Sequence, residues 1–86
     1  MTIKTSDIDW QETGTEVAQT LSEYLQVDTV NPPGNELDGA RFLADKLSAD
    51  GIATQIIESS PGRGNLIARL KGTTDEPALC FLSHID

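Results

Sequence analysis

A chain of 86 residues has the length of one small domain or of part of a larger one. Its apolar content of 37% includes only one Trp, one Tyr and two Phe, which allows a core but a thin one. The formal net charge of −8 makes nucleic acids and anionic membranes unfavourable partners, because both are negatively charged. A single cysteine excludes an internal disulfide.

The start of the chain does not have the composition of a targeting segment. Its first ten residues are polar and partly acidic, whereas a secretory signal needs an apolar central stretch. The longest apolar run is far shorter than the roughly 20 residues that cross a bilayer. We therefore expect a soluble, cytoplasmic protein with no membrane partner.

The first expected helix follows a polar tail of residues 1–8. Asp9 is a typical N-cap residue, and Glu12 stands three positions later, as in a capping box. Helical spacing of apolar residues then predicts a helix to about Val27, although Gly14 weakens its first turns. The residues of this apolar face are Trp10, Val17, Leu21, Tyr24 and Leu25.

A second helix is expected after the turn formed by residues 28–34. The two prolines in this turn fix the backbone and remove amide donors, so the first helix cannot continue through it. Asn35 is positioned to cap the second helix and Gly51 to follow its end. The apolar stripe of this helix is Leu37, Ala40, Leu43, Ala44 and Leu47.

Three strands are expected after Gly51, at residues 52–57, 65–70 and 78–82, with turns between them. The short links predict antiparallel neighbours at one edge of a mixed sheet. The third strand is apolar throughout, which predicts cover on both of its faces and burial of Cys80. The fold class is therefore α/β, with two helices followed by three strands of a mixed sheet.

The candidate site is the pair His84 and Asp86. Ligands collect at the carboxyl ends of strands in open α/β sheets, and the histidine comes directly after the third expected strand. Residues two apart on an extended chain lie on the same side of it. Asp86 can then accept a proton from one ring nitrogen of His84, which orients the ring as a metal ligand. Alone, the triplet also fits an ordinary surface or core pair.

The wider context favours the site. Motifs spread over the chain from about Glu16 resemble, in order and separation, the start of an M20-family metallopeptidase, the family of acetylornithine deacetylase, succinyl-diaminopimelate desuccinylase, aminoacylase and glutamate carboxypeptidase. These motifs are Tyr24-Leu25-Gln26-Val27-Asp28-Thr29-Val30-Asn31-Pro32-Pro33-Gly34-Asn35-Glu36, Phe42-Leu43-Ala44, Gly51-Ile52, Gly64-Asn65-Leu66-Ile67-Ala68-Arg69-Leu70-Lys71-Gly72 and Leu82-Ser83-His84-Ile85-Asp86.

The resemblance implies that residues 9–86 are the N-terminal portion of a zinc-peptidase-like α/β/α catalytic domain, truncated after the first metal ligand. His84 would be that ligand in a two-zinc centre, and Asp86 the catalytic residue that orients it. Cobalt or manganese could replace zinc. The remaining ligands and the general-base glutamate have no matching position here, so we expect residues 1–86 alone to be inactive.

The reaction implied is hydrolysis of an amide bond in an N-acyl amino acid or a small peptide by metal-activated water. The substrate is thus a small molecule, but no substrate-binding residue can be named. A homodimer stays open for the full-length protein. Two alternatives are a non-catalytic remnant or interaction module, and a fragment of an M28-type zinc aminopeptidase. The Asn-Pro-Pro-Gly turn and the Asn-Leu-Ile-Ala-Arg-Leu strand favour M20 over M28.

Three further features have simple structural interpretations. Residues 31–34 could help to shape the wall of the site, but a rigid turn between the helices explains them fully. Glu36 is explained by its position in the first turn of a helix. Arg63 could meet an anionic group of a substrate, but it is more simply a solvated residue of the turn between two strands.

Overall fold

A computed structural model of the chain describes residues 3–86. The element order is a short 3-10 turn at Thr5–Asp7, helix α1 (Trp10–Leu25), helix α2 (Glu36–Ala49), and strands β1 (Thr54–Ser60) and β2 (Arg63–Ala68). Met1 and Thr2, the start of the expected polar tail, lie outside the described residues. The chain thus has the mixed helix and strand content expected of a small α/β fragment.

Helix α1 begins as expected. The Asp9 side chain accepts hydrogen bonds from the backbone N–H groups of Gln11 and Glu12, which confirms it as the N-cap. The helix ends at Leu25, two residues before the expected position. Its apolar face stays largely uncovered, with exposed fractions of 62% for Trp10 and 72% for Leu25.

The core lies where α2 packs against the hairpin of β1 and β2. Ala40 is fully buried and Ala44 is 9% exposed, which confirms the stripe expected on this helix. The two strands are antiparallel, and their register pairs Ile56 with Leu66. Gly64 of β2 lies so close to Leu37 of α2 that a Cβ there would be 3.0 Å from a Leu37 methyl carbon. The hairpin therefore packs tightly on the first turns of α2.

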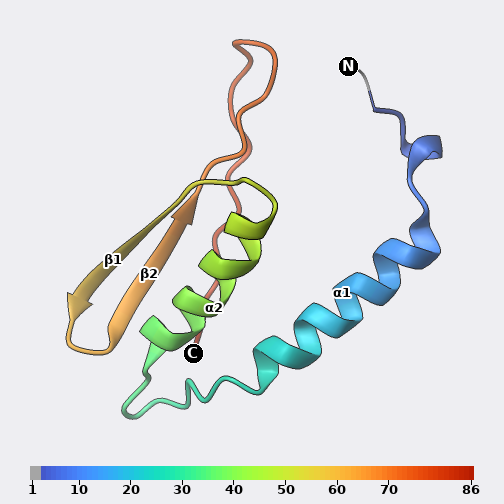
Figure 1. Cartoon of the computed structure of the whole chain (residues 1–86). Coiled ribbons are helices and arrows are strands. Elements are labelled where there is room, and N and C mark those ends of the chain that lie inside the picture. Colours follow the sequence, from blue (N-terminus) through green and yellow to red (C-terminus); the bar gives the residue numbers. More distant parts are fainter. Residues whose placement is uncertain (1–2) are drawn as a thin grey trace.

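The third expected strand is not formed within residues 3–86, which hold a two-stranded antiparallel sheet and not a three-stranded mixed one. After a loop, residues 78–86 run back beside α2 and end near the start of that helix (Figure 1). Residues 78–82 form no strand and pair with neither β1 nor β2 in the described chain. Leu79, Phe81 and Leu82 are exposed, and the expected burial of Cys80 is wrong.

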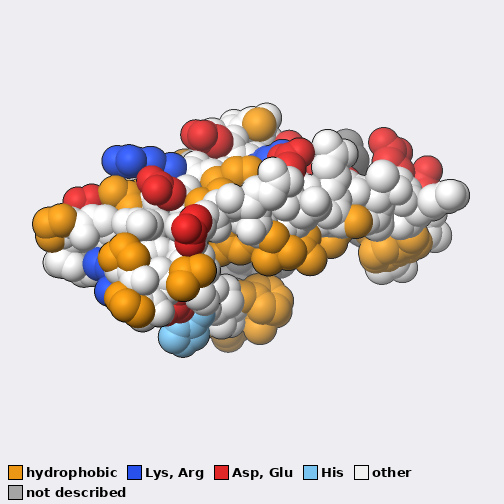
Figure 2. All heavy atoms as spheres, turned by 90° about the horizontal axis from the view of Figure 1, so that it is seen from below, with side chains coloured by type: hydrophobic (Ala, Val, Ile, Leu, Met, Phe, Trp, Pro, Cys, Tyr) orange, Lys and Arg blue, Asp and Glu red, His pale blue; other side chains and the backbone are white. Residues whose placement is uncertain are grey.

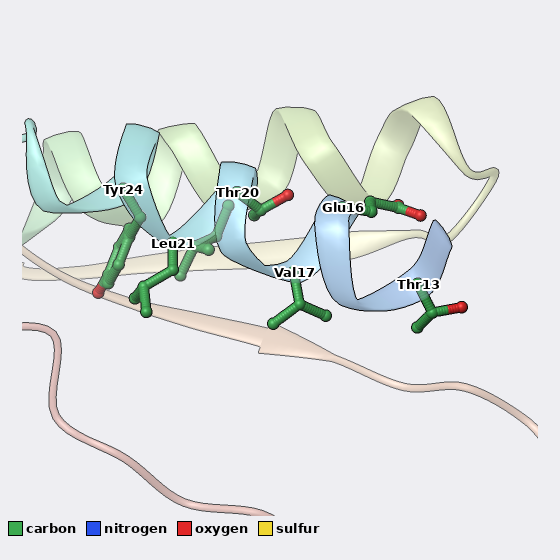
Figure 3. Close-up of a pocket in the computed structure, with 7 residues that line it drawn as sticks. Thr13, Glu16, Val17, Thr20, Leu21 and Tyr24 are labelled. Atoms are coloured by element: carbon green, nitrogen blue, oxygen red, sulfur yellow. The ribbon is translucent and has the colours of Figure 1, made fainter. Parts of the chain in front are cut away.

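Helix α2 lies between α1 and the hairpin (Figure 1). The two helices meet where the Tyr24 and Phe42 rings have centroids 5.9 Å apart and Lys46 Nζ lies 2.9 Å from Glu23 Oε2. The hydrogen bond from Lys46 lowers the pKa of Glu23. A shallow groove of about 430 Å³ lies along α1 and is bounded on the α2 side by Leu43. Val17, Leu21 and Tyr24, which line it, project from the same side of α1 (Figure 3).

Hydrophobic side chains remain visible over much of the face of the molecule seen from below (Figure 2). Neither α1 nor α2, the two α-helices of the described chain, is long and apolar enough to cross a membrane.

Candidate functional site

His84 and Asp86 lie together as the sequence predicts. His84 Nδ1 is 3.2 Å from Asp86 Oδ1, which is hydrogen-bond distance. With a proton on Nδ1, the ring donates to the carboxylate, and Nε2 then presents a lone pair outward. The His84 side chain is 92% exposed and is seen at the surface in Figure 2, whereas the Asp86 side chain is 27% exposed. The ring is thus open to solvent, and its partner is partly enclosed.

The segment that follows α1 holds the residues around His84. The Thr29 hydroxyl donates to the backbone carbonyl of Ile85 at 3.1 Å. The Asn31 side-chain amide donates to Asp86 Oδ2 at 3.4 Å, so the two oxygens of this carboxylate face different partners. These bonds join residues 55 and 56 positions apart in the chain.

Ile85 packs on α2 at a glycine. A Cβ on Gly39 would lie 2.7 Å from Ile85 Cγ2, closer than real Cβ atoms approach their neighbours. The absence of a side chain at this position therefore allows Ile85 to reach the helix surface. It places the backbone that carries His84 and Asp86 directly beside the first turns of α2.

An ion pair lies next to this segment. Arg63 Nη2 donates to Glu36 Oε1 at 2.7 Å, and Arg63 Nε lies 2.6 Å from Glu36 Oε2. The second contact lacks hydrogen-bond geometry, which leaves the buried Oε2 without a hydrogen-bond partner among residues 3–86. The hydrogen bond from Arg63 holds the pKa of Glu36 below its ordinary value, and the negative charge of Asp86 opposes this effect.

Gly34 makes room for the Glu36 carboxylate. Its φ of 105° lies in the region that favours glycine, and a Cβ there would be 2.6 Å from Glu36 Oε2. The next residue, Asn35, is the N-cap of α2, as expected, but its φ is 52° and its side chain makes no capping hydrogen bond. The turn before α2 is therefore shaped around the carboxylate of Glu36.

A shallow cavity of about 470 Å³ adjoins the site. Its wall is formed by residues 24–30, at the end of α1 and in the following segment, together with Ile85 and Asp86. Among these residues, Tyr24 is partly buried, and this burial raises the pKa of its hydroxyl.

The described residues fit a metal ion only in part. His84 offers one exposed nitrogen with an orienting carboxylate behind it, which suits a single ligand position. Within residues 3–86, no three or more His, Cys, Asp or Glu side chains gather where they could hold a metal ion. A catalytic zinc site normally has three protein ligands, so further donors are needed to complete one.

Several contacts at the site were not expected from the sequence. Arg63 is the first residue of β2, and its side chain is 41% exposed but pairs with Glu36, so the role of Glu36 goes beyond the first turn of its helix. The Asn31 side chain reaches Asp86 in addition to its place in the turn. Separations of 27 and 55 residues leave no periodic signal, so only the folded chain reveals these pairs.

Comparisons with models of protein families, with curated proteins and with solved structures found no match to this chain.

Proposed function

We propose that the chain is the N-terminal part of the catalytic domain of a zinc-dependent M20-type hydrolase that cleaves amide bonds of N-acyl amino acids or small peptides. The observation that carries the proposal is the pair of His84 Nδ1 and Asp86 Oδ1 at 3.2 Å, within the motif that the resemblance assigns to the first metal ligand. Cobalt or manganese could take the place of zinc.

In this proposal His84 binds the metal through Nε2, and Asp86 keeps the proton on Nδ1. A carboxylate in this position fixes the tautomer of the ring and makes the imidazole a better ligand. The bound metal would activate water and polarise the substrate carbonyl. Residues 3–86 supply one ligand and its orienting group, and the other ligands and the general base would lie in further parts of the catalytic domain.

The proposal also assigns a partner to the exposed segment 78–82. Its apolar sequence suits a buried strand of a mixed sheet, and the edge of β2 that faces away from β1 is the place where such a strand could pair. In the complete domain, this strand would deliver His84 to the carboxyl edge of the sheet.

The test begins with the DNA downstream of the Asp86 codon. We expect it to encode an aspartate and then adjacent glutamates that complete the site, and a stop codon directly after Asp86 would remove the proposal. The protein made from the complete reading frame should bind two zinc ions and hydrolyse N-acetyl amino acids.

Two variants and a matched control sharpen this test. His84→Ala should lower hydrolysis to the background rate, and Asp86→Asn should weaken zinc binding about 10- to 100-fold. Asp75→Asn makes the same chemical change in the exposed loop and should leave both properties unchanged. For residues 1–86 alone, we expect calorimetry to detect no tight binding of two zinc ions, and we expect no turnover of an N-acetyl amino acid. Tight binding of two zinc ions or measurable turnover would contradict the proposal that the other ligands lie in further parts of the domain.

A further inference from the structure

We infer that Thr29 and Asn31 are positioning residues, which hold the His84–Asp86 pair in the one arrangement that directs Nε2 of His84 outward. The inference rests on the proposed function and adds a second layer of contacts behind the metal ligand. Both residues belong to the segment between α1 and α2, far from His84 in the chain and in contact with the residues that follow it.

The two contacts restrain different degrees of freedom. Thr29 bonds to the main-chain carbonyl of Ile85, and this bond fixes the backbone between His84 and Asp86. Asn31 bonds to Asp86 Oδ2 and leaves Oδ1 for the ring. A carboxylate that is held through one oxygen cannot rotate freely, so the other oxygen keeps its direction toward His84 Nδ1.

The exposure of the two side chains explains why such restraint is needed. His84 is 92% exposed, so no packing fixes the ring, and its orientation depends on the carboxylate. The Asp86 side chain is 27% exposed and lies against the segment that carries Thr29 and Asn31. The orientation of the His84 ring therefore depends on the contact of Asn31 with Asp86 and of Asp86 with the ring, and not on packing around the ring.

The amide of Asn31 is the critical group, because only a donor can satisfy Asp86 Oδ2. Asn31→Asp keeps the shape of the side chain and replaces the donor with a second carboxylate, which would repel Asp86. Asn65→Asp is the matched control, since it makes the same substitution and the same change in net charge at an exposed position of β2. Thr29→Val removes the hydroxyl and keeps the branched shape.

The experiment measures the tautomer of His84 by ¹⁵N NMR in the metal-free protein expressed from its complete reading frame. The His84 signal is identified as the one that is lost in His84→Gln. We expect the Nδ1–H tautomer to predominate in the unmodified protein. The ratio of Nδ1–H to Nε2–H should fall at least threefold in Asn31→Asp, fall less in Thr29→Val, and stay unchanged in Asn65→Asp. This readout does not depend on bound metal or on catalysis.

The outcomes separate this inference from the proposed function. If Asn31→Asp and Asn65→Asp show the same tautomer ratio, or if Nε2–H predominates without any substitution, the positioning role is wrong. If the tautomer ratio responds as expected and the protein neither binds zinc nor hydrolyses amides, the positioning role stands and the proposed function fails. If both hold, zinc affinity should also fall about tenfold in Asn31→Asp and remain constant in the control.

Discussion

Glu36 joins three parts of the chain at one carboxylate. It is the first residue of α2, it binds Arg63 at the start of β2, and its side chain occupies the space that Gly34 leaves open. With an exposed fraction of 8%, it is the one charged residue that is buried among residues 3–86. A charge in this position is stable only when it is paired, so removal of either partner leaves the other poorly satisfied.

This ion pair predicts a specific dependence of stability on pH. Arg63 lowers the pKa of Glu36 in the folded chain from its ordinary value of 4.5. The pair therefore stabilises the folded state fully above about pH 4.5, and this contribution is lost as the pH falls through the lower pKa of the folded state. Glu36→Gln should lower the urea midpoint at neutral pH. It should also make the midpoint decrease less steeply as the pH falls below about 4.5.

The urea midpoints are measured on the protein expressed from its complete reading frame, from about pH 3 to about pH 7, which spans the titration range of carboxylates. Glu76→Gln, in the exposed loop between residues 72 and 77, is the control and should keep the acid-dependent fall. Curves for Glu36→Gln and the unmodified chain that differ only by a constant offset would contradict the role given to this pair.

At the scale of the elements, two helical glycines have opposite surroundings. A Cβ on Gly14 of α1 would meet nothing within 4 Å, whereas a Cβ on Gly39 of α2 would collide with Ile85. Alanine is favoured over glycine in a helix interior by roughly 0.5–1 kcal/mol. Substitution by alanine should therefore raise the helix propensity at both positions, but it should disturb the candidate site only at Gly39.

We predict that Gly14→Ala raises the stability of α1 by about 0.5–1 kcal/mol and leaves the Thr29–Ile85 contact intact. Gly39→Ala should displace Ile85 from α2 and break this contact. Helicity by circular dichroism and the nuclear Overhauser effect between the methyl groups of Thr29 and Ile85 report the two effects. If the nuclear Overhauser effect between these methyl groups persists in Gly39→Ala, the position of Ile85 does not depend on the absence of a side chain at Gly39.

The local elements were predictable because their signals are local. The Asp9 cap, the stripe around Ala40, and Gly51 with its φ of 76° after α2 follow from nearest neighbours in the sequence. The turn between β1 and β2 is tighter than expected, so β1 ends three residues later and β2 begins two residues earlier than expected. The outer end of each strand is two residues shorter than expected. The pairing of His84 with Asp86 also follows from spacing, but the contacts of Asn31 and Arg63 depend on the tertiary fold.

The whole molecule is open for its size. Its radius of gyration is 15.1 Å, whereas a compact domain of this length has about 12 Å. Its accessible surface is 7416 Å², compared with about 5,000 Å² for a folded monomer of 9.3 kDa. The excess includes the apolar face of α1 and the segment 78–82, where Leu82 is 96% exposed.

Residues 1–86 in isolation should therefore melt over a broad range and associate with other copies. Exposed apolar surface and an uncovered sheet edge both promote association. Sedimentation velocity at several concentrations and thermal circular dichroism measure the two properties, and binding of a hydrophobic dye reports the exposed surface. A sharp, cooperative melt of a monomer would show that this prediction is wrong.

The contact between Asn31 and Asp86 has a consequence for the order in which the chain assembles. Closing a flexible loop of this length costs about 3 to 4 kcal/mol of chain entropy before the constant term is added. The part-buried Thr29–Ile85 bond and the exposed Asn31–Asp86 bond offset only part of that cost, at about 0.5–1.5 kcal/mol each. The cost falls when α2 and the hairpin form first, because β2, which ends at Ala68, packs against α2 and shortens the loop that remains to be closed. His84 and Asp86 should thus dock last during folding and detach first on unfolding.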